Sequence, residues 1–208
     1  SVWAIDERGE RKGRYDKMHP VMFGEYVPLG EIFPWLYRLT PMGNGLTAGT
    51  EPRSFEVDGI RFAPNICFEN TVPHLIRRQV RHLEAKGERP DVLVTVTNDG
   101  WFWGSSLLDH HLACGVFRAV ELRRPLLIAA NTGFSAWIDD RGRIRARGPR
   151  RSEGIVTAEV FPAANGSSLY LQFGDVAAIL CAMTCLVAAC QHVVRRVSAR
   201  SVHSGKLG

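Results

Sequence analysis

The sequence lacks the cysteine patterns that support a disulfide framework or a metal site. Its five cysteines include no pair in CxxC spacing, and no cysteine–histidine cluster has zinc spacing. Cys181, Cys185 and Cys190 fall inside one apolar run, where we interpret them as small apolar residues. The adjacent His110 and His111 diverge on a helix, which favours surface or site-lining positions over metal ligation. We expect no metal and no cofactor.

The sequence also lacks basic residues interleaved with aromatic ones, the pattern typical of a surface that stacks nucleic-acid bases. The formal net charge is +5, from 26 Lys and Arg against 21 Asp and Glu. Much of the basic charge lies in 141–151, which holds six arginines, and after Val194. Lipid headgroups or a membrane-orientation signal explain this distribution better than DNA does. We therefore expect a membrane as partner and no nucleic acid.

No internal repeat, low-complexity segment or signal peptide is present, and the chain begins without Met in the strand-like stretch 1–6. We expect it to be a fragment. Its 208 residues suffice for one domain with a sizeable core plus an appendage. The expected divisions are the C-terminal part of a folded domain at 1–165, a linker at 166–175, a transmembrane helix at 176–194 and a basic tail at 195–208.

Strand-like and helix-like segments alternate along the first 160 residues, which predicts an α/β fold with hairpins among buried strands. One helix is expected after Asn70 or Thr71 as cap, with Pro73 in its first turn, and another from Leu108 to near Pro125. Residues 20–50 hold four Pro and five Gly, which predicts an irregular excursion. The expected strands are 2–5, 12–17, 55–57, 60–66, 91–97, 126–130, 135–138, 143–146 and 154–160.

The segment 176–194 is apolar apart from Thr184, Gln191 and His192. At 1.5 Å per residue it extends over roughly 28 Å, close to the hydrocarbon thickness of a bilayer. Arginines follow it at once, so the positive-inside rule predicts a cytoplasmic tail and a preceding domain outside the cytoplasm. A buried amphipathic core helix is the alternative, which the lack of a polar face disfavours.

Cys67 follows the expected strand 60–66 and precedes a helix. A nucleophile on a tight strand-to-helix turn is exposed at the sheet edge, where backbone N–H groups can form an oxyanion hole. Taken alone, a single cysteine is more often a small core residue. Glu69, two residues later, equally suits a helix start favoured by the helix dipole.

Four stretches occur in order along the chain. They are 15–28, which contains Lys17 and Phe-Gly-Glu25-Tyr-Val-Pro; Ile-Cys-Phe-Glu at 66–69; Asn-Asp-Gly-Trp-Phe at 98–102; and Asn-Thr-Gly-Phe-Ser at 131–135. Together they resemble the nitrilase, or carbon–nitrogen hydrolase, superfamily, and more narrowly the apolipoprotein N-acyltransferase family. The resemblance covers nearly all of residues 1–195. It implies a nitrilase-like four-layer αββα sandwich, truncated at its N-terminus and followed by one transmembrane helix.

The resemblance implies a Glu–Lys–Cys triad in which Cys67 is the nucleophile and Lys17 the lysine, with Glu25 and Glu69 as accessory glutamates. The chemistry agrees, because a thiol needs a base to form thiolate and an ammonium stabilises both thiolate and oxyanion. Without the ordered motifs, Lys17 is better interpreted as a solvated surface lysine and Glu25 as a loop acid. Phe68 stands where the family usually has tyrosine, which keeps the aromatic wall.

The triad glutamate of the family lies well upstream of the lysine, at a strand end. The acids before Lys17 lack that context; they are Asp6, Glu7, Glu10 and Asp16. We therefore expect the general base to lie outside this sequence and the chain to be inactive alone.

The implied activity is acyl transfer at the bacterial inner membrane, with the catalytic domain on the periplasmic side. Cys67 would attack a phospholipid ester, and the resulting thioester would be resolved by the α-amine of a diacylglyceryl-modified apolipoprotein. Trp101, Phe102 and Trp103 would line a lipid entry, or equally form a hydrophobic plug. Two alternatives stay open: an amidase or nitrilase acting on small C–N bonds, and a non-catalytic remnant.

Overall fold

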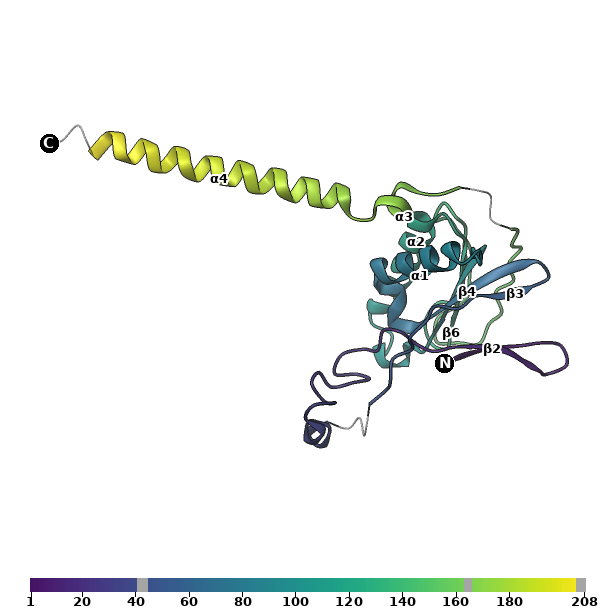
Figure 1. Ribbon diagram of the computed structural model, residues 1–208. Helices are drawn as coiled ribbons and strands as arrows, with labels where there is room; N and C mark the ends of the chain where they lie inside the picture. The colour runs from purple at the N-terminus through teal and green to yellow at the C-terminus, as the bar shows by residue number, and fades with distance from the viewer. Residues whose placement is uncertain (41–44, 163–165, 205–208) are drawn as a thin grey trace. The chain divides into compact units, whose positions relative to one another are not determined.

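The computed structural model describes residues 1–40, 45–162 and 166–204, with side chains as far as His192 in the last stretch. The chain divides into two units, Ser1–Leu171 and Gln172–Gly208. Figure 1 shows the elements of the first unit. Its strands are β1 Val2–Ile5, β2 Arg11–Tyr15, β3 Phe55–Val57, β4 Ile60–Ile66, β5 Val92–Thr97, β6 Leu126–Ala130, β7 Ala136–Ile138 and β8 Ile144–Arg147. Its helices are the 3-10 turns η1 Pro34–Leu39, η2 Cys67–Thr71 and η3 Asp99–Phe102, with α1 Pro73–Ala85 and α2 Leu107–Leu122, and α3 Leu169–Phe173 crosses the boundary.

A six-stranded sheet of order β3-β4-β5-β6-β7-β8 forms the centre of the first unit, and β1 and β2 pair in a separate antiparallel sheet. The three central strands β4, β5 and β6 are parallel, whereas β3, β7 and β8 run antiparallel to their neighbours. Helix α1 connects β4 to β5 and α2 connects β5 to β6. The carboxyl ends of the three parallel strands therefore lie at one edge of the sheet.

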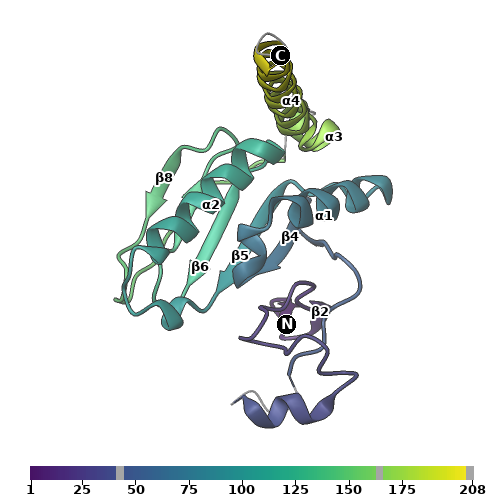
Figure 2. The same ribbon diagram turned by 90° about the vertical axis from the view of Figure 1, so that its left-hand side faces the viewer.

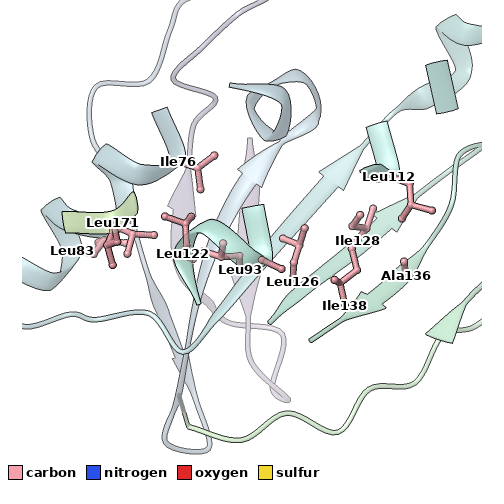
Figure 3. Close-up of a cluster of buried hydrophobic side chains, with 13 residues drawn as sticks. Ile76, Leu83, Leu93, Leu112, Leu122, Leu126, Ile128, Ala136, Ile138 and Leu171 are labelled. Atoms are coloured by element: carbon pink, nitrogen blue, oxygen red, sulfur yellow. The ribbon is translucent and has the colours of Figure 1, made fainter. Parts of the chain in front are cut away.

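Helices α1 and α2 cover one face of this sheet (Figure 2). Their apolar stripes meet one row of strand residues, Ala63, Leu93, Leu126 and Ile138, which the strand register places side by side. Figure 3 shows this buried cluster, to which the helices contribute Ile76, Val80, Leu83, Leu112, Ala119 and Leu122. The two helices expected in this region are confirmed, and each buries apolar side chains against the sheet.

Gly115 lets α2 approach the sheet closely. A Cβ atom at this position would lie 2.9 Å from Ile128 Cδ1 and 2.9 Å from Leu126 Cδ2, closer than side-chain carbons pack. The missing side chain is thus part of the fit between helix and sheet.

The sequence-based expectations differ from the structure at several places. Residues 154–160, expected as a strand, form none, and Ile155 is 95% exposed, because β-propensity alone supplies no partner strand. Asn70 and Thr71 lie within η2 and do not cap α1, whose N-cap position is held by Val72 without a side-chain hydrogen bond. Residues within the expected linker 166–175 form α3. The expected α/β fold is confirmed. Of its four expected layers, the described residues form one helical layer and one large sheet, together with the separate two-stranded sheet of β1 and β2.

The second unit is dominated by α4, Val176–Ser204. Its apolar side chains are exposed, among them Val176, Ile179, Leu180, Met183, Leu186 and Val187. No helix within the described part of the chain combines the length and the apolarity that crossing a membrane requires. Val193 and Val194, the end of the expected span, and the expected tail 195–208 lie outside the residues whose side chains are described.

Candidate active site

Cys67 occupies the turn between β4 and α1. It is the first residue of η2, it is partly exposed, and its backbone φ of 53° lies in the left-handed region. That conformation costs a non-glycine residue about 1–2 kcal/mol and is concentrated at functional sites. The expectation of a tight strand-to-helix turn at this cysteine is confirmed.

The carboxylate of Glu69 joins the Cys67 turn to the segment that carries Lys17. One oxygen accepts from the backbone N–H groups of Met18 at 2.6 Å and His19 at 3.0 Å. The other accepts from the Tyr15 hydroxyl at 2.9 Å and the Ile66 N–H at 2.6 Å. Glu69 is fully buried, so these four bonds replace its hydration. Burial, followed by the charge and hydrogen bond of Glu69, raises the pKa of Tyr15, so its hydroxyl stays a donor.

Lys17 lies buried against Glu25. Its ammonium donates to both carboxylate oxygens, at 2.7 and 2.6 Å, and it is 9% exposed. The Val21 N–H donates to the same Glu25 carboxylate at 2.7 Å, which fixes the acid within its own loop. Lys17 is therefore not the solvated surface residue of the alternative interpretation. The two contacts to Glu25 give the buried side chain of Lys17 a hydrogen-bonded carboxylate partner in place of water.

An apolar cavity of about 440 Å³ opens beside the Cys67 turn. Phe68, Trp101 and Phe102 contribute aromatic walls, and Glu25 contributes a carboxyl group to the lining. Phe68 is stacked against the exposed ring of His19, with ring centroids 5.9 Å apart. Trp103 does not contribute to the lining and is 85% exposed. Three of the four aromatic residues expected at the site thus line one cavity.

Sequence reasoning missed a buried Asp99–His111 pair beside Cys67. His111 Nδ1 lies 3.0 Å from Asp99 Oδ1, and its Nε2 lies 3.2 Å from the carbonyl oxygen of Cys67. Burial would raise the pKa of Asp99, but hydrogen bonds from His111 and Thr97 outweigh it and lower that pKa. The signal available was Asp99 within the Asn-Asp-Gly-Trp-Phe stretch, because a buried acid at a parallel strand end needs a partner.

Among the residues that the structure describes, no group of three or more His, Cys, Asp or Glu side chains is arranged to hold a metal ion. His110 is exposed, whereas the neighbouring His111 is 8% exposed and uses both ring nitrogens as described above.

The comparison with known families agrees with this geometry. The sequence profile of the carbon–nitrogen hydrolases matches residues 1–166. The chain belongs to the carbon–nitrogen hydrolase family. The turn of Cys67, the Lys17–Glu25 pair, Glu69 and the aromatic cavity all lie inside the matched residues of this carbon–nitrogen hydrolase domain.

Relatives of this chain carry the name apolipoprotein N-acyltransferase, among them proteins of two bacteria. The protein of Rhodopirellula baltica is 39% identical over 177 residues, which are 84% of this chain and 30% of the relative. The protein of Geobacter metallireducens is 39% identical over 181 residues, which are 87% of this chain and 33% of the relative. The chain thus spans about a third of the curated relatives it matches. Among solved structures, an amidase from Nesterenkonia sp. has a TM-score of 0.49 and 18% identity, over 71% of this chain and 49% of that one.

Proposed function

We propose that this chain forms the nucleophile-bearing part of an apolipoprotein N-acyltransferase, with Cys67 as the acyl-accepting residue. The observation that carries the proposal is the 39% identity to proteins of that name over more than four fifths of the chain. The left-handed turn at Cys67 and the adjoining apolar cavity support it, because the reaction needs an exposed nucleophile beside a site for an acyl chain.

The proposed reaction has two steps. The Cys67 thiolate attacks the carbonyl carbon of a phospholipid ester, and a thioester forms as the lysophospholipid leaves with a proton. The α-amine of a diacylglyceryl-modified apolipoprotein then attacks the thioester, so that an amide forms, the amine loses a proton and the Cys67 thiol is restored. In both steps the Lys17 ammonium stabilises the oxyanion, and the aromatic walls of the cavity hold the acyl chain.

Glu25 and Glu69 serve this proposed reaction by positioning other groups. The Glu25 carboxylate is occupied by Lys17 and the Val21 N–H, and Glu69 accepts four hydrogen bonds. A general base must accept the thiol proton, and neither carboxylate has that freedom. The triad glutamate of the proposal is therefore a group other than these two.

The membrane is the proposed location of the reaction, because its acyl donor is a phospholipid. The exposed apolar side chains of α4 support attachment there, since such a surface on a helix is stable against lipid or a partner and unfavourable in water. The proposed topology places the catalytic unit on the periplasmic side and the C-terminus in the cytoplasm. Labelling a cysteine introduced at Gly205 with a membrane-impermeant reagent tests it; labelling from outside intact cells contradicts it.

N-acylation of a diacylglyceryl lipopeptide in detergent and phospholipid tests the proposed function. We expect transfer by the intact protein that contains this chain and none by Cys67→Ala, whereas Cys181→Ala retains it. Hydrolysis of small amides without lipopeptide acylation would favour an amidase and contradict the proposal. Absence of both reactions would favour the non-catalytic alternative.

A further inference from the structure

The imidazole of His111 lies between two hydrogen-bond acceptors. On one side is the Asp99 carboxylate, 3.0 Å from Nδ1, and on the other the carbonyl oxygen of Cys67, 3.2 Å from Nε2. His111 is 8% exposed and Asp99 3% exposed, so water competes little for either contact. The bridge spans three elements, η2, η3 and α2, at the edge where the proposed nucleophile sits.

The chemistry of the two partners selects one protonation state of His111. A carbonyl oxygen only accepts, and an ionised carboxylate only accepts. A neutral imidazole has one N–H and satisfies one of them, whereas an imidazolium donates from both nitrogens. Deprotonation would leave the remaining proton on Nδ1 toward the charged Asp99, and the contact to Cys67 would be lost.

The contact to the Cys67 carbonyl sets the direction of the neighbouring N–H group. Within one peptide unit the C=O and N–H bonds are coplanar and point in opposite directions. A hydrogen bond that fixes the Cys67 carbonyl therefore fixes the N–H of Phe68. The first N–H groups of a helical turn have no partner inside that turn, so they are available to an oxyanion formed at Cys67.

The support behind Asp99 is equally specific. The Thr97 hydroxyl donates to Asp99 Oδ1 at 2.7 Å, and the backbone N–H of Asp99 donates to Asn131 Oδ1 at 3.0 Å. A Cβ atom at position 133 would lie 2.0 Å from Asp99 Oδ2, so the space for the carboxylate depends on glycine there. The side chain of Asn70 donates to the backbone carbonyl of His111 at 3.3 Å, which ties α2 to η2 directly.

We propose that His111, as an imidazolium held by Asp99, is a positioning residue that locks the left-handed Cys67 peptide and aims the Phe68 N–H at the oxyanion of acyl transfer. This inference rests on the proposed function only in taking Cys67 as the nucleophile. The titratable groups around the imidazole are Asp99 from η3, Cys67 from η2, Glu25 across the cavity, and His110 and Cys114 on its own helix.

Two reactions of Cys67 in the full chain distinguish a positioning role of His111 from a merely structural one. Acylation by p-nitrophenyl butyrate passes through an oxyanion, whereas alkylation by iodoacetamide does not. Mass spectrometry of the tryptic peptide 62–77, which contains Cys67 as its only cysteine, measures both. Loss of one oxyanion donor lowers acylation by roughly 10²-fold. In His111→Gln we expect that loss in the acylation rate, with alkylation within about threefold of wild type. His82→Gln, at an exposed histidine of α1, is the control and leaves both rates unchanged.

Asp99→Asn provides the pH-dependent arm. An amide donates to Nδ1 of a neutral imidazole, which then keeps its proton on Nε2 toward the Cys67 carbonyl. We expect the ratio of acylation to alkylation to fall with rising pH in wild type and to stay flat in Asp99→Asn. The inference is overturned if His111→Gln lowers the acylation and alkylation rates equally, or leaves the acylation rate unchanged. It is also overturned if the ratio of acylation to alkylation has the same pH profile in wild type and in Asp99→Asn. Fast butyryl transfer to Cys67 without transfer from phospholipid would refute the proposed function while leaving this inference intact.

Discussion

Glu69 accepts a hydrogen bond from the backbone N–H of Met18 at 2.6 Å, although the two residues are 51 positions apart. Met18 directly follows Lys17, and Glu69 stands two residues after Cys67. The same carboxylate also accepts from Ile66, the last residue of β4. One buried acid thus fixes the lysine-bearing segment to the turn of the proposed nucleophile.

Replacing Glu69 with Gln tests this role. In glutamine an NH₂ group, which only donates, replaces one of the two carboxylate oxygens. At least one N–H or hydroxyl group that donated to that oxygen therefore loses its acceptor. Each hydrogen bond to a charged group contributes about 1.5–3 kcal/mol, and we expect the free energy of unfolding to fall by about 2–4 kcal/mol. Urea denaturation followed by circular dichroism measures the change. Glu153→Gln, at an exposed position, should leave stability within about 0.5 kcal/mol of wild type. Equal changes in unfolding free energy for the two variants would show that Glu69 does not fix the Lys17 segment to the Cys67 turn.

Glu25→Gln should act on Lys17 and leave the fold largely intact, because Glu25 is partly exposed, lines the cavity and lies outside the helices and strands. The amide keeps the size of the side chain but loses the charge that holds the ammonium at 2.6 Å. A small displacement of a catalytic group costs about 10²-fold in rate, and we expect that loss in kcat for lipopeptide acylation. Thermal unfolding of the same variant is the control measurement. A wild-type kcat would remove Glu25 from the positioning role.

The lowered pKa of the Asp99 carboxyl predicts that the free energy of unfolding depends on pH. Burial would raise its pKa, but hydrogen bonds from His111 and Thr97 and the charge of His111 lower it below the ordinary 3.8. A pKa lowered by folding contributes stability above the unfolded pKa, and that contribution is lost as the pH falls through the folded value. The difference in unfolding free energy between wild type and Asp99→Asn should therefore be largest above about pH 5 and shrink toward pH 3. Denaturant titrations across this range measure it, with the exposed Asp140→Asn as control. A difference that is constant with pH would contradict the assignment.

Gly115→Ala should destabilise the first unit by overpacking. The new methyl group would meet Leu126 and Ile128 at 2.9 Å, and such insertions cost about 1–3 kcal/mol despite the better helix propensity of alanine. Gly166→Ala is the matched control, because a Cβ atom there meets nothing within 4 Å. Differential scanning calorimetry of both variants gives the comparison. A stabilised Gly115→Ala protein would mean that α2 does not press on the sheet as described.

Local signals in the sequence predict most of the strands and helices of the first unit. The strands expected at 55–57, 60–66 and 91–97 and the two expected helices each depend on patterns among near neighbours, and the structure confirms them as β3, β4, β5, α1 and α2. The strand expected at 154–160 depended on a distant partner, which no local pattern reveals. The caps expected at Asn70 and Thr71 failed because η2 takes up both residues.

The candidate site shows the same division. The order of the motifs pointed to Lys17, Glu25, Cys67 and Glu69 as site residues. Only the fold shows that Glu25 pairs with Lys17 and that the Glu69 carboxylate accepts four hydrogen bonds. His111 could not be distinguished from His110 by sequence, since adjacent histidines differ only in which helix face is buried. The pairing with Asp99 joins a strand end to the following helix, a contact set by tertiary packing.

The central claim is that Cys67 carries the acyl chain. The most direct measurement is mass spectrometry of the tryptic peptide 62–77 after the intact protein is incubated with a phospholipid of defined chain length and no lipopeptide. We predict a mass increase equal to that acyl group on Cys67, its disappearance when the lipopeptide is added, and none in Cys67→Ala. An unmodified peptide 62–77 in a preparation that still acylates the lipopeptide would contradict the account.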